Sequence, residues 1–306
     1  MSAVAVSTTA PAEAAFPGVN GPIIYPCVPN ADSNGDLCRL EPDTLTVQVI
    51  ADGMFPVRSD RVGVSADGSM VAYSQVQGIF VRRIGGPFVY PGPLGQSGAA
   101  DVGFTPDGAA IVHRCLAGLC RTVISGGPPS PIAGTVPGDR FPEVNPAGTR
   151  IAFVNGSTLF TIPLAGGTRT PLVSGITIDQ VSWAPDGSRI AFLAGAGLCP
   201  AAGIATVPAG GGPVTCLPNG QGATHPSFSP DGTQIFVALA DHAALLGAKG
   251  VGRREVFGLG TVAGNNWAPR RAAANPRCAA LFGQLDRTTD LRAREAIQRH
   301  LRAAGC

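Results

Sequence analysis

A short turn sequence ending in Asp-Gly recurs along this 306-residue chain at an almost constant spacing. Each copy starts at an apolar anchor residue and leads into a short apolar run. The intervals are 40, 40, 39 and 45 residues, and the third copy has Ala147 in place of Asp. The five copies are Val64–Gly68, Phe104–Gly108, Val144–Gly148, Trp183–Gly187 and Phe228–Gly232. A period of about 40–45 residues with strand-turn-strand content indicates a β-propeller with one four-stranded blade per repeat.

Composition agrees with many short strands joined by turns. The chain has 42 glycines and 28 prolines, while 44% of its residues are hydrophobic. Glycine accepts the turn conformation and Asp bonds to its own backbone, so the repeated Asp67, Asp107, Asp186 and Asp231 are predicted to be turn residues. Only 14% of residues are charged and the formal net charge is +2, which disfavours a nucleic-acid partner. The longest apolar run, 235–248, is too short and too polar to span a bilayer.

The two ends of the repeat array are predicted to share blades. Residues 23–25, 36–40 and 46–49 match the second, third and fourth strands of a blade without its first strand, which brings the count to six. Ring closure by strands from both ends removes open sheet edges, and residues 250–262 are a candidate for completing the last blade. We expect a leader or signal-peptide remnant at 1–19, a propeller at 20–262 and a helical tail at 263–306 with helices at 277–285 and 289–305.

Eight cysteines fall into neighbouring pairs, which predicts disulfides and an oxidising compartment. The pairs are Cys27 with Cys38, Cys115 with Cys120, Cys199 with Cys216, and Cys278 with Cys306. We therefore expect an extracytoplasmic protein, in the periplasm, in the cell envelope or secreted.

The turn and the strand after it resemble the WD-like Ser-Pro-Asp-Gly repeat of the TolB-like β-propeller family. The match is carried by Pro226–Phe236 and Val181–Phe192, and similar copies extend over about residues 20–240. The resemblance implies a six-bladed propeller and little about activity. TolB also has an N-terminal α/β domain, for which no room is left before Gly21, and no G-x-S-x-G hydrolase motif occurs in the chain.

Candidate ligand-binding residues lie at the start of each innermost strand, three or four positions before the anchor. Because that strand lines the channel, its entry loop should lie at one mouth of the disc. The residues are Asp60, Arg61, Asp101, Arg140, Phe141, Asp179, Gln180 and His225. Such a mixed polar rim can orient a peptide segment or a small ligand, although loop residues are also polar simply because they face water. His113, by contrast, occupies an aromatic packing position of the repeat.

No metal-ligand spacing, Ser-His-Asp set, phosphate loop or dinucleotide fingerprint is visible, so we predict no cofactor and no metal. The leading hypothesis is a secreted or envelope-associated, non-catalytic propeller that binds a protein or peptide at the rim. The alternative is a hydrolase or lyase acting on a sugar or lactone at the channel mouth, for which Asp60, Asp101, Asp179 and His225 are the candidate groups. The identity of the partner and the oligomeric state stay open.

Overall fold

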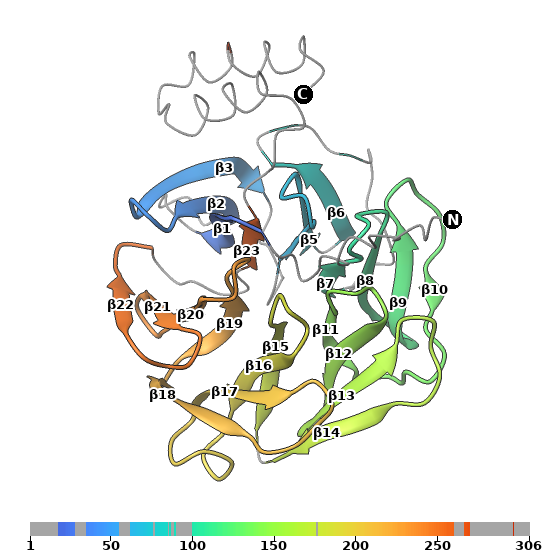
Figure 1. The fold of residues 1–306 in the computed structure, drawn as a ribbon. Coiled ribbons are helices and arrows are strands. Elements are labelled where there is room, and N and C mark those ends of the chain that lie inside the picture. Colours follow the sequence, from blue (N-terminus) through green and yellow to red (C-terminus); the bar gives the residue numbers. More distant parts are fainter. Residues whose placement is uncertain are drawn as a thin grey trace, which may run out of the picture. The chain divides into compact units, whose positions relative to one another are not determined.

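The computed structural model describes residues 18–27, 35–54, 62–75, 77–84, 86, 89, 100–175, 177–259, 266–269 and 296. Within them the chain forms six antiparallel sheets arranged about a common axis (Figure 1). The innermost strands contact one another in the cyclic order β23, β4, β7, β11, β15, β19 and back to β23. The ring is therefore closed, and the fold is an all-β, six-bladed propeller as the repeat predicted.

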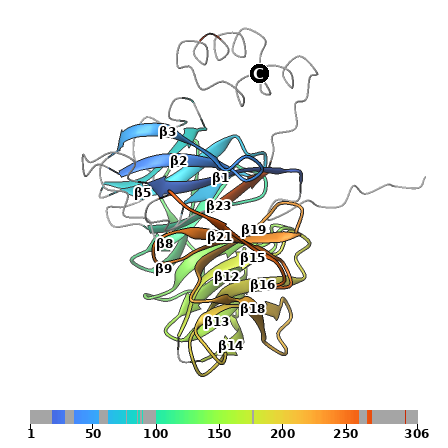
Figure 2. The same ribbon diagram turned by 90° about the vertical axis from the view of Figure 1, so that its left-hand side faces the viewer.

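Blade 1 joins the two ends of the repeat array. It has the order β23-β1-β2-β3, made of β1 (Asn20–Cys27), β2 (Gly35–Glu41), β3 (Thr46–Met54) and the innermost β23 (Asn266–Pro269). Ile23 pairs with Trp267 and Ile24 with Asn266, so β1 and β23 lie side by side (Figure 2). The predicted missing first strand is thus supplied from the far end of the array.

Blades 2 and 3 follow in sequence. Blade 2 has three described strands, β4 (Gly63–Val64), β5 (Met70–Gln75) and β6 (Gly78–Arg83), and Val89 N donates to Val81 O at its outer side. Blade 3 consists of β7 (Ala100–Phe104), β8 (Ala110–Cys115), β9 (Gly118–Val123) and β10 (Ser130–Pro131).

The remaining three blades each have four strands. Blade 4 consists of β11 (Arg140–Val144), β12 (Arg150–Asn155), β13 (Thr158–Pro163) and β14 (Thr170–Ser174). Blade 5 consists of β15 (Ile178–Trp183), β16 (Arg189–Ala194), β17 (Gly203–Pro208) and β18 (Thr215–Gln221). Blade 6 consists of β19 (Thr224–Phe228), β20 (Gln234–Ala238), β21 (Ala243–Gly247) and β22 (Arg253–Val256), so the last blade is completed by residues 253–256 of the candidate segment 250–262.

One expected boundary needs correction. Residues 263–306 were predicted to be a helical tail, but 266–269 form β23 inside the propeller, which therefore extends beyond residue 262. The reason is ring closure: β1 needs a partner on its inner side, and β23 provides it. The predicted helices at 277–285 and 289–305, the pair Cys278 and Cys306, and the leader up to residue 17 lie outside the described residues, apart from a helical Ala296.

The repeated turn is built by its own side chains. Gly68, Gly108, Gly187 and Gly232 have φ between 65° and 70°, which favours glycine. Asp67, Asp107, Asp186 and Asp231 each accept a hydrogen bond from the backbone N–H two residues later. In the third copy, Asn145 Oδ1 replaces the missing carboxylate and accepts from Thr149 N and Arg150 N, both at 2.8 Å. The Asp residues are accounted for as turn residues.

The core lies between neighbouring blades. Ile23 and Tyr25 of blade 1 pack with Phe236 and Leu245 of blade 6, and the other blades share clusters in the same way. One aromatic position of the second strand is fully buried in every blade, and its residues are Tyr25, Tyr73, His113, Phe153, Phe192 and Phe236. This confirms the packing role predicted for His113.

His113 is the polar member of that series. Its Nε2 lies 2.9 Å from Thr122 Oγ1 and its Nδ1 lies 3.0 Å from Arg114 O. Burial lowers the pKa of His113, and the hydrogen bond to Arg114 O only partly opposes that effect. The imidazole is therefore held as a neutral, hydrogen-bonded core group.

Three disulfides are formed in the described residues, Cys27–Cys38, Cys115–Cys120 and Cys199–Cys216. Cys27–Cys38 links the second and third strands of blade 1, and Cys115–Cys120 links those of blade 3. Cys199–Cys216 connects the loop after β16 to β18. Three of the four predicted pairs are thereby confirmed.

Candidate binding site

Six of the eight candidate residues lie at the beginnings of the innermost strands. Asp101 is on β7, Arg140 and Phe141 are on β11, Asp179 and Gln180 are on β15, and His225 is on β19. Asp60 and Arg61 occupy the corresponding place before β4 but lie outside the described residues. These strands run side by side in the ring, so their starts meet at one mouth, which we call the rim.

The rim has an unusual backbone that repeats in four successive blades. The residue three positions before the anchor has a positive φ, which is 53° at Asp101, 53° at Phe141, 46° at Gln180 and 49° at His225. At each of these places the pairing with the second strand shifts register. A bulge of this kind redirects a side chain, and the left-handed backbone conformation is energetically unfavourable for residues other than glycine. Strained positions held by the surrounding structure cluster at functional sites.

Gln180 and His225 connect the rims of blades 5 and 6. The backbone N–H of His225 donates to Gln180 Oε1 at 2.6 Å, and Gln180 Nε2 lies 2.8 Å from His225 Nε2. The first bond fixes the amide orientation, so the NH2 group faces the ring and His225 Nε2 must accept. The proton then resides on Nδ1, which lies 3.0 Å from Thr224 Oγ1. The contact thus selects one neutral tautomer of His225.

Arg140 and Asp179 make the matching connection between blades 4 and 5. Arg140 Nε lies 3.3 Å from Asp179 Oδ1, and the two side chains are 34% and 27% exposed. The Arg140 guanidinium also lies over the Phe141 ring, 5.6 Å from its centroid. The Arg140 guanidinium is therefore held by the neighbouring Phe141 ring, while both side chains of the ion pair remain partly exposed to water.

Asp101 behaves differently from these rim residues. Its side chain is only 3% exposed, and its Oδ2 lies 3.8 Å from Arg114 Nε on β8 of the same blade. The structure therefore brings Arg140 together with Asp179 and Gln180 together with His225, each pair across two blades, whereas the ion pair of Asp101 with Arg114 lies within blade 3. Sequence register predicted the place of these residues and not their pairing.

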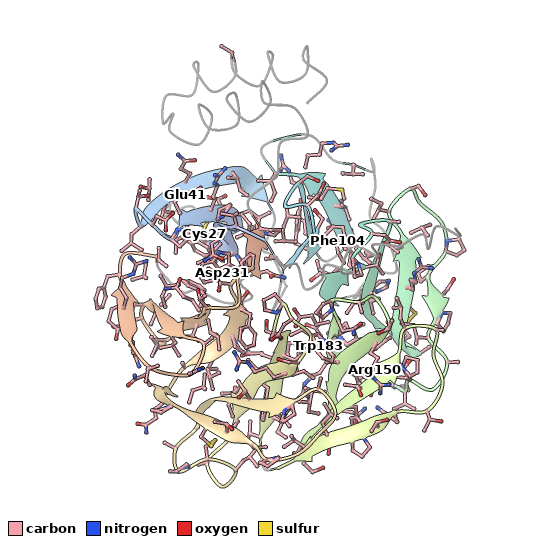
Figure 3. The ribbon with its side chains drawn as sticks, viewed as in Figure 1. Cys27, Glu41, Phe104, Arg150, Trp183 and Asp231 are labelled. Atoms are coloured by element: carbon pink, nitrogen blue, oxygen red, sulfur yellow. A yellow bond between two sulfur atoms is a disulfide. The ribbon has the colours of Figure 1, made fainter. Side chains whose placement is uncertain are left out.

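A second set of polar groups, one step further into the ring, was missed by the sequence analysis. The residue directly before the anchor accepts a backbone N–H from the next blade: Glu143 Oε2 from Trp183, Ser182 Oγ from Phe228, and Ser227 Oγ from Trp267, at 2.9, 3.1 and 2.9 Å. Trp183 lies near the centre of the ring (Figure 3). The signal available in the sequence was a polar residue just before a buried anchor.

In blades 2 and 3 the same position is glycine. A Cβ on Gly63 would lie 2.9 Å from Val102 O, and one on Gly103 would lie 3.0 Å from Pro142 O. These two blades therefore approach their neighbours through bare backbone where the others use a side chain. The innermost strands are thus bonded or packed directly to one another beneath the rim.

Within the described residues, no group of three or more His, Cys, Asp or Glu side chains is arranged to hold a metal ion. No helix in this part of the chain combines the length and apolar character needed to cross a membrane.

The ring of blades can be compared with solved structures. TolB from Acinetobacter baumannii superposes with a TM-score of 0.68 at 17% identity, over 82% of this chain and 67% of that one. The fold is a TolB-like six-bladed propeller. A putative TolB from Agrobacterium tumefaciens gives a TM-score of 0.63 at 18% identity, covering 80% of this chain and 91% of that one.

The TolB-like fold also resembles a chain in a crystal structure of a nidogen/laminin complex, with a TM-score of 0.63 at 10% identity. That match covers 82% of this chain and 99% of the other. No protein-family model matches the sequence, and no curated protein matches it. At these identities the likeness defines the fold alone.

Proposed function

We propose that this chain is an extracytoplasmic, non-catalytic propeller that binds a protein or peptide segment across the rim. The observation that carries the proposal is the strained backbone at Asp101, Phe141, Gln180 and His225, repeated at equivalent places in four blades. Such geometry costs stability at each position and is kept where it presents side chains for binding.

The pairing of the rim side chains favours recognition over catalysis. Asp179 is engaged by Arg140, and His225 Nε2 is occupied by Gln180, so these two groups already have partners from adjacent blades. An extended peptide offers alternating N–H and C=O groups that can exchange with amide, imidazole and guanidinium groups of this kind. Arg140, whose side chain is 34% exposed, adds a positive charge that would pair with an acidic group of the segment and set its register.

Two further observations support an extracytoplasmic location and a role in protein binding. Three disulfides suit an oxidising compartment. The similar folds include TolB structures and a chain from a complex of two proteins. The proposed organisation is a leader at 1–19, the propeller, and a short helical tail after it.

The test is capture of a partner from the host envelope fraction by the full chain. We expect a stoichiometric protein partner whose binding falls at least about tenfold when Arg140→Ala and Gln180→Ala are combined. Arg121→Ala is the matched control, because Arg121 is an exposed arginine on β9, away from the rim. Retained capture by the double variant would overturn the rim assignment.

The enzymatic alternative gives a different result. It predicts turnover of a lactone or glycoside that is lost with His225→Ala or Asp179→Asn, together with a stoichiometric metal in the purified protein. Turnover of this kind without a captured partner would replace the binding proposal.

A further inference from the structure

A cavity of about 340 Å³ lies between blades 5 and 6, at the end of the strands away from the rim. Arg189 is the first residue of β16, and its neighbour Ile190 pairs with Trp183, the last residue of β15. The rim residues Asp179 and Gln180 lie near the other end of β15, at its start. The polar lining consists of Ser188, Arg189, Thr206, Thr215 and Lys249. The volume is in the range of small-molecule sites.

The lining carries two cations from different blades. Arg189 comes from blade 5, and Lys249 follows β21 of blade 6 and is the only lysine in the chain. Lys249 has no ion pair with any described residue. Pro213 and Leu217 form an apolar wall beside these charges, whereas the Val207 side chain is fully buried and packs toward blade 4. The cavity thus joins a positive end to an apolar surface.

One carboxylate lies near the cations. Burial acts against ionisation of Asp186, but hydrogen bonds from Ser188 and the charge of Arg189 outweigh it and lower the pKa of Asp186. Its Oδ1 already accepts from Ser188 N at 2.9 Å and Ser188 Oγ at 2.7 Å. Asp186 therefore offsets part of the Arg189 charge, while no described carboxylate forms an ion pair with Lys249.

Blade 4 contains an equivalent arginine and threonine, and there the two side chains are hydrogen-bonded to each other. Arg150 and Thr161 occupy the places of Arg189 and Thr206, because Ala152 pairs with Thr161 as Ala191 pairs with Thr206. Arg150 Nη2 donates to Thr161 Oγ1 at 2.7 Å. The buried Nε of Arg189, by contrast, has no hydrogen-bond partner in the described part of the chain.

The Arg189 side chain is nevertheless held in position. Its guanidinium carbon lies over the Phe228 ring of blade 6, 5.4 Å from the centroid. This Nε is closed off from solvent, so a ligand in the cavity would meet the outer Nη1 and Nη2 groups of Arg189, which bond to no described residue. An aromatic platform and a bidentate guanidinium suit a planar carboxylate.

We propose that this cavity binds a small organic carboxylate. The carboxylate lies between Arg189 and Lys249, with Thr206 and Thr215 as hydroxyl donors, and its apolar body rests on Pro213 and Leu217. The site is separate from the rim and would be occupied whether or not a protein partner is bound there.

The test uses hexanoate and its neutral isostere hexanamide as probes. Reductive ¹³C-methylation labels only the α-amine and the side chain of Lys249, because the chain has no other lysine. Hexanoate should shift the Lys249 methyl signal saturably with an affinity of about 1 mM, and hexanamide should not. Inorganic phosphate in a parallel titration distinguishes a carboxylate site from a general anion site.

Variants test whether Arg189 and Lys249 bind the carboxylate or only support the fold. Arg189→Gln and Lys249→Gln should each weaken hexanoate binding, by about tenfold for Arg189→Gln. Arg150→Gln is the matched control, because Arg150, labelled in Figure 3, occupies the same place in blade 4; it should leave the affinity unchanged within about twofold.

Isothermal calorimetry on unlabelled Lys249→Gln, whose side chain is exposed, provides a measurement that does not depend on the stability of the Arg189 variant. The proposal is overturned by equal binding of hexanamide, by tighter binding of phosphate, by no saturable binding, or by hexanoate affinity that is unchanged in both cation variants.

Discussion

Gln180 of blade 5 holds both the main chain and the imidazole of His225 in blade 6. Its Oε1 accepts from His225 N at 2.6 Å while its Nε2 faces His225 Nε2 at 2.8 Å. A single amide thus fixes the position and the tautomer of a histidine 45 residues away in the chain. The rim is therefore a set of cross-blade contacts that a ligand must either use or displace.

The tautomer of His225 can be switched by one substitution. In Gln180→Glu, a carboxylate oxygen replaces the NH2 group, so His225 Nε2 must carry a proton to bond with it. We expect the ring ¹⁵N shifts of His225 to change from a form protonated on Nδ1 to one protonated on Nε2. His113, buried in blade 3, serves as an internal reference whose shifts stay constant. The same His225 tautomer in both proteins would contradict the amide orientation.

The left-handed backbone at Asp101 makes its own prediction. Asn tolerates φ of 53° as Asp does, whereas a β-branched residue does not. Asp101→Val should lower the free energy of unfolding by about 1–3 kcal/mol. Asp101→Asn should cost less than Asp101→Val, because Asn adopts the left-handed conformation as readily as Asp does. Urea denaturation measures both, and equal losses would show that charge dominates over conformation.

The buried His113 predicts a pH dependence of stability. Because burial lowers its pKa, the unfolded chain binds a proton below the ordinary value of 6.5 while the folded chain does not. Stability should therefore fall as pH drops through the window between 6.5 and the lower folded value, by up to about 1.4 kcal/mol per pH unit. Above that window the group contributes no slope.

His113→Phe places in blade 3 the residue that blades 4, 5 and 6 already have, and it should remove this slope. The variant loses the bond to Thr122, which costs about 1 kcal/mol at every pH. Hydrogen bonds to Asp241 and, to a smaller extent, to Glu255 raise the pKa of His242. Its contribution to stability therefore falls as pH rises, opposite to that of His113, and it is the same in the wild type and in the variant. Parallel stability–pH curves for wild type and variant would refute the assignment.

The three disulfides should differ in their contributions to stability. The loop closed by Cys199–Cys216 spans 17 residues and that closed by Cys115–Cys120 spans 5. On chain entropy alone, replacing the first pair by alanine should cost about 3 kcal/mol and the second about 2 kcal/mol. Thermal unfolding of the two double variants tests this order. A larger loss from the shorter loop would show that native packing around the sulfur atoms outweighs loop closure.

The repeat predicted the architecture because the turn is a local structure. The Asp-Gly turns, the buried position of His113 and three cysteine pairs depend on residues close in sequence, and all were predicted correctly. The strand β23 was missed because Asn266–Pro269 is not followed by an Asp-Gly turn. Its partner β1 is at the other end of the chain, so no local signal marks it.

The candidate site shows the same division. Register counted from the anchors led to Asp101, Arg140, Gln180 and His225, which lie near the starts of the innermost strands, and their role in binding stays a prediction. It could not show that Arg140 pairs with Asp179, or Gln180 with His225, because those contacts depend on how adjacent blades rotate against each other. The burial of Asp101 and the role of Glu143 at Trp183 were hidden for the same reason.

The join between β1 and β23 also has a consequence for biosynthesis. The ribosome makes β1 first among the described strands and β23 last among the propeller strands. Until Trp267 emerges, the inner side of β1 is an uncovered row of amide and carbonyl groups, open to pairing with another nascent chain. Translation that stalls before residue 266 therefore leaves blade 1 as a three-stranded sheet with an unpaired inner edge, and polysomes become the place where this protein is most exposed to self-association.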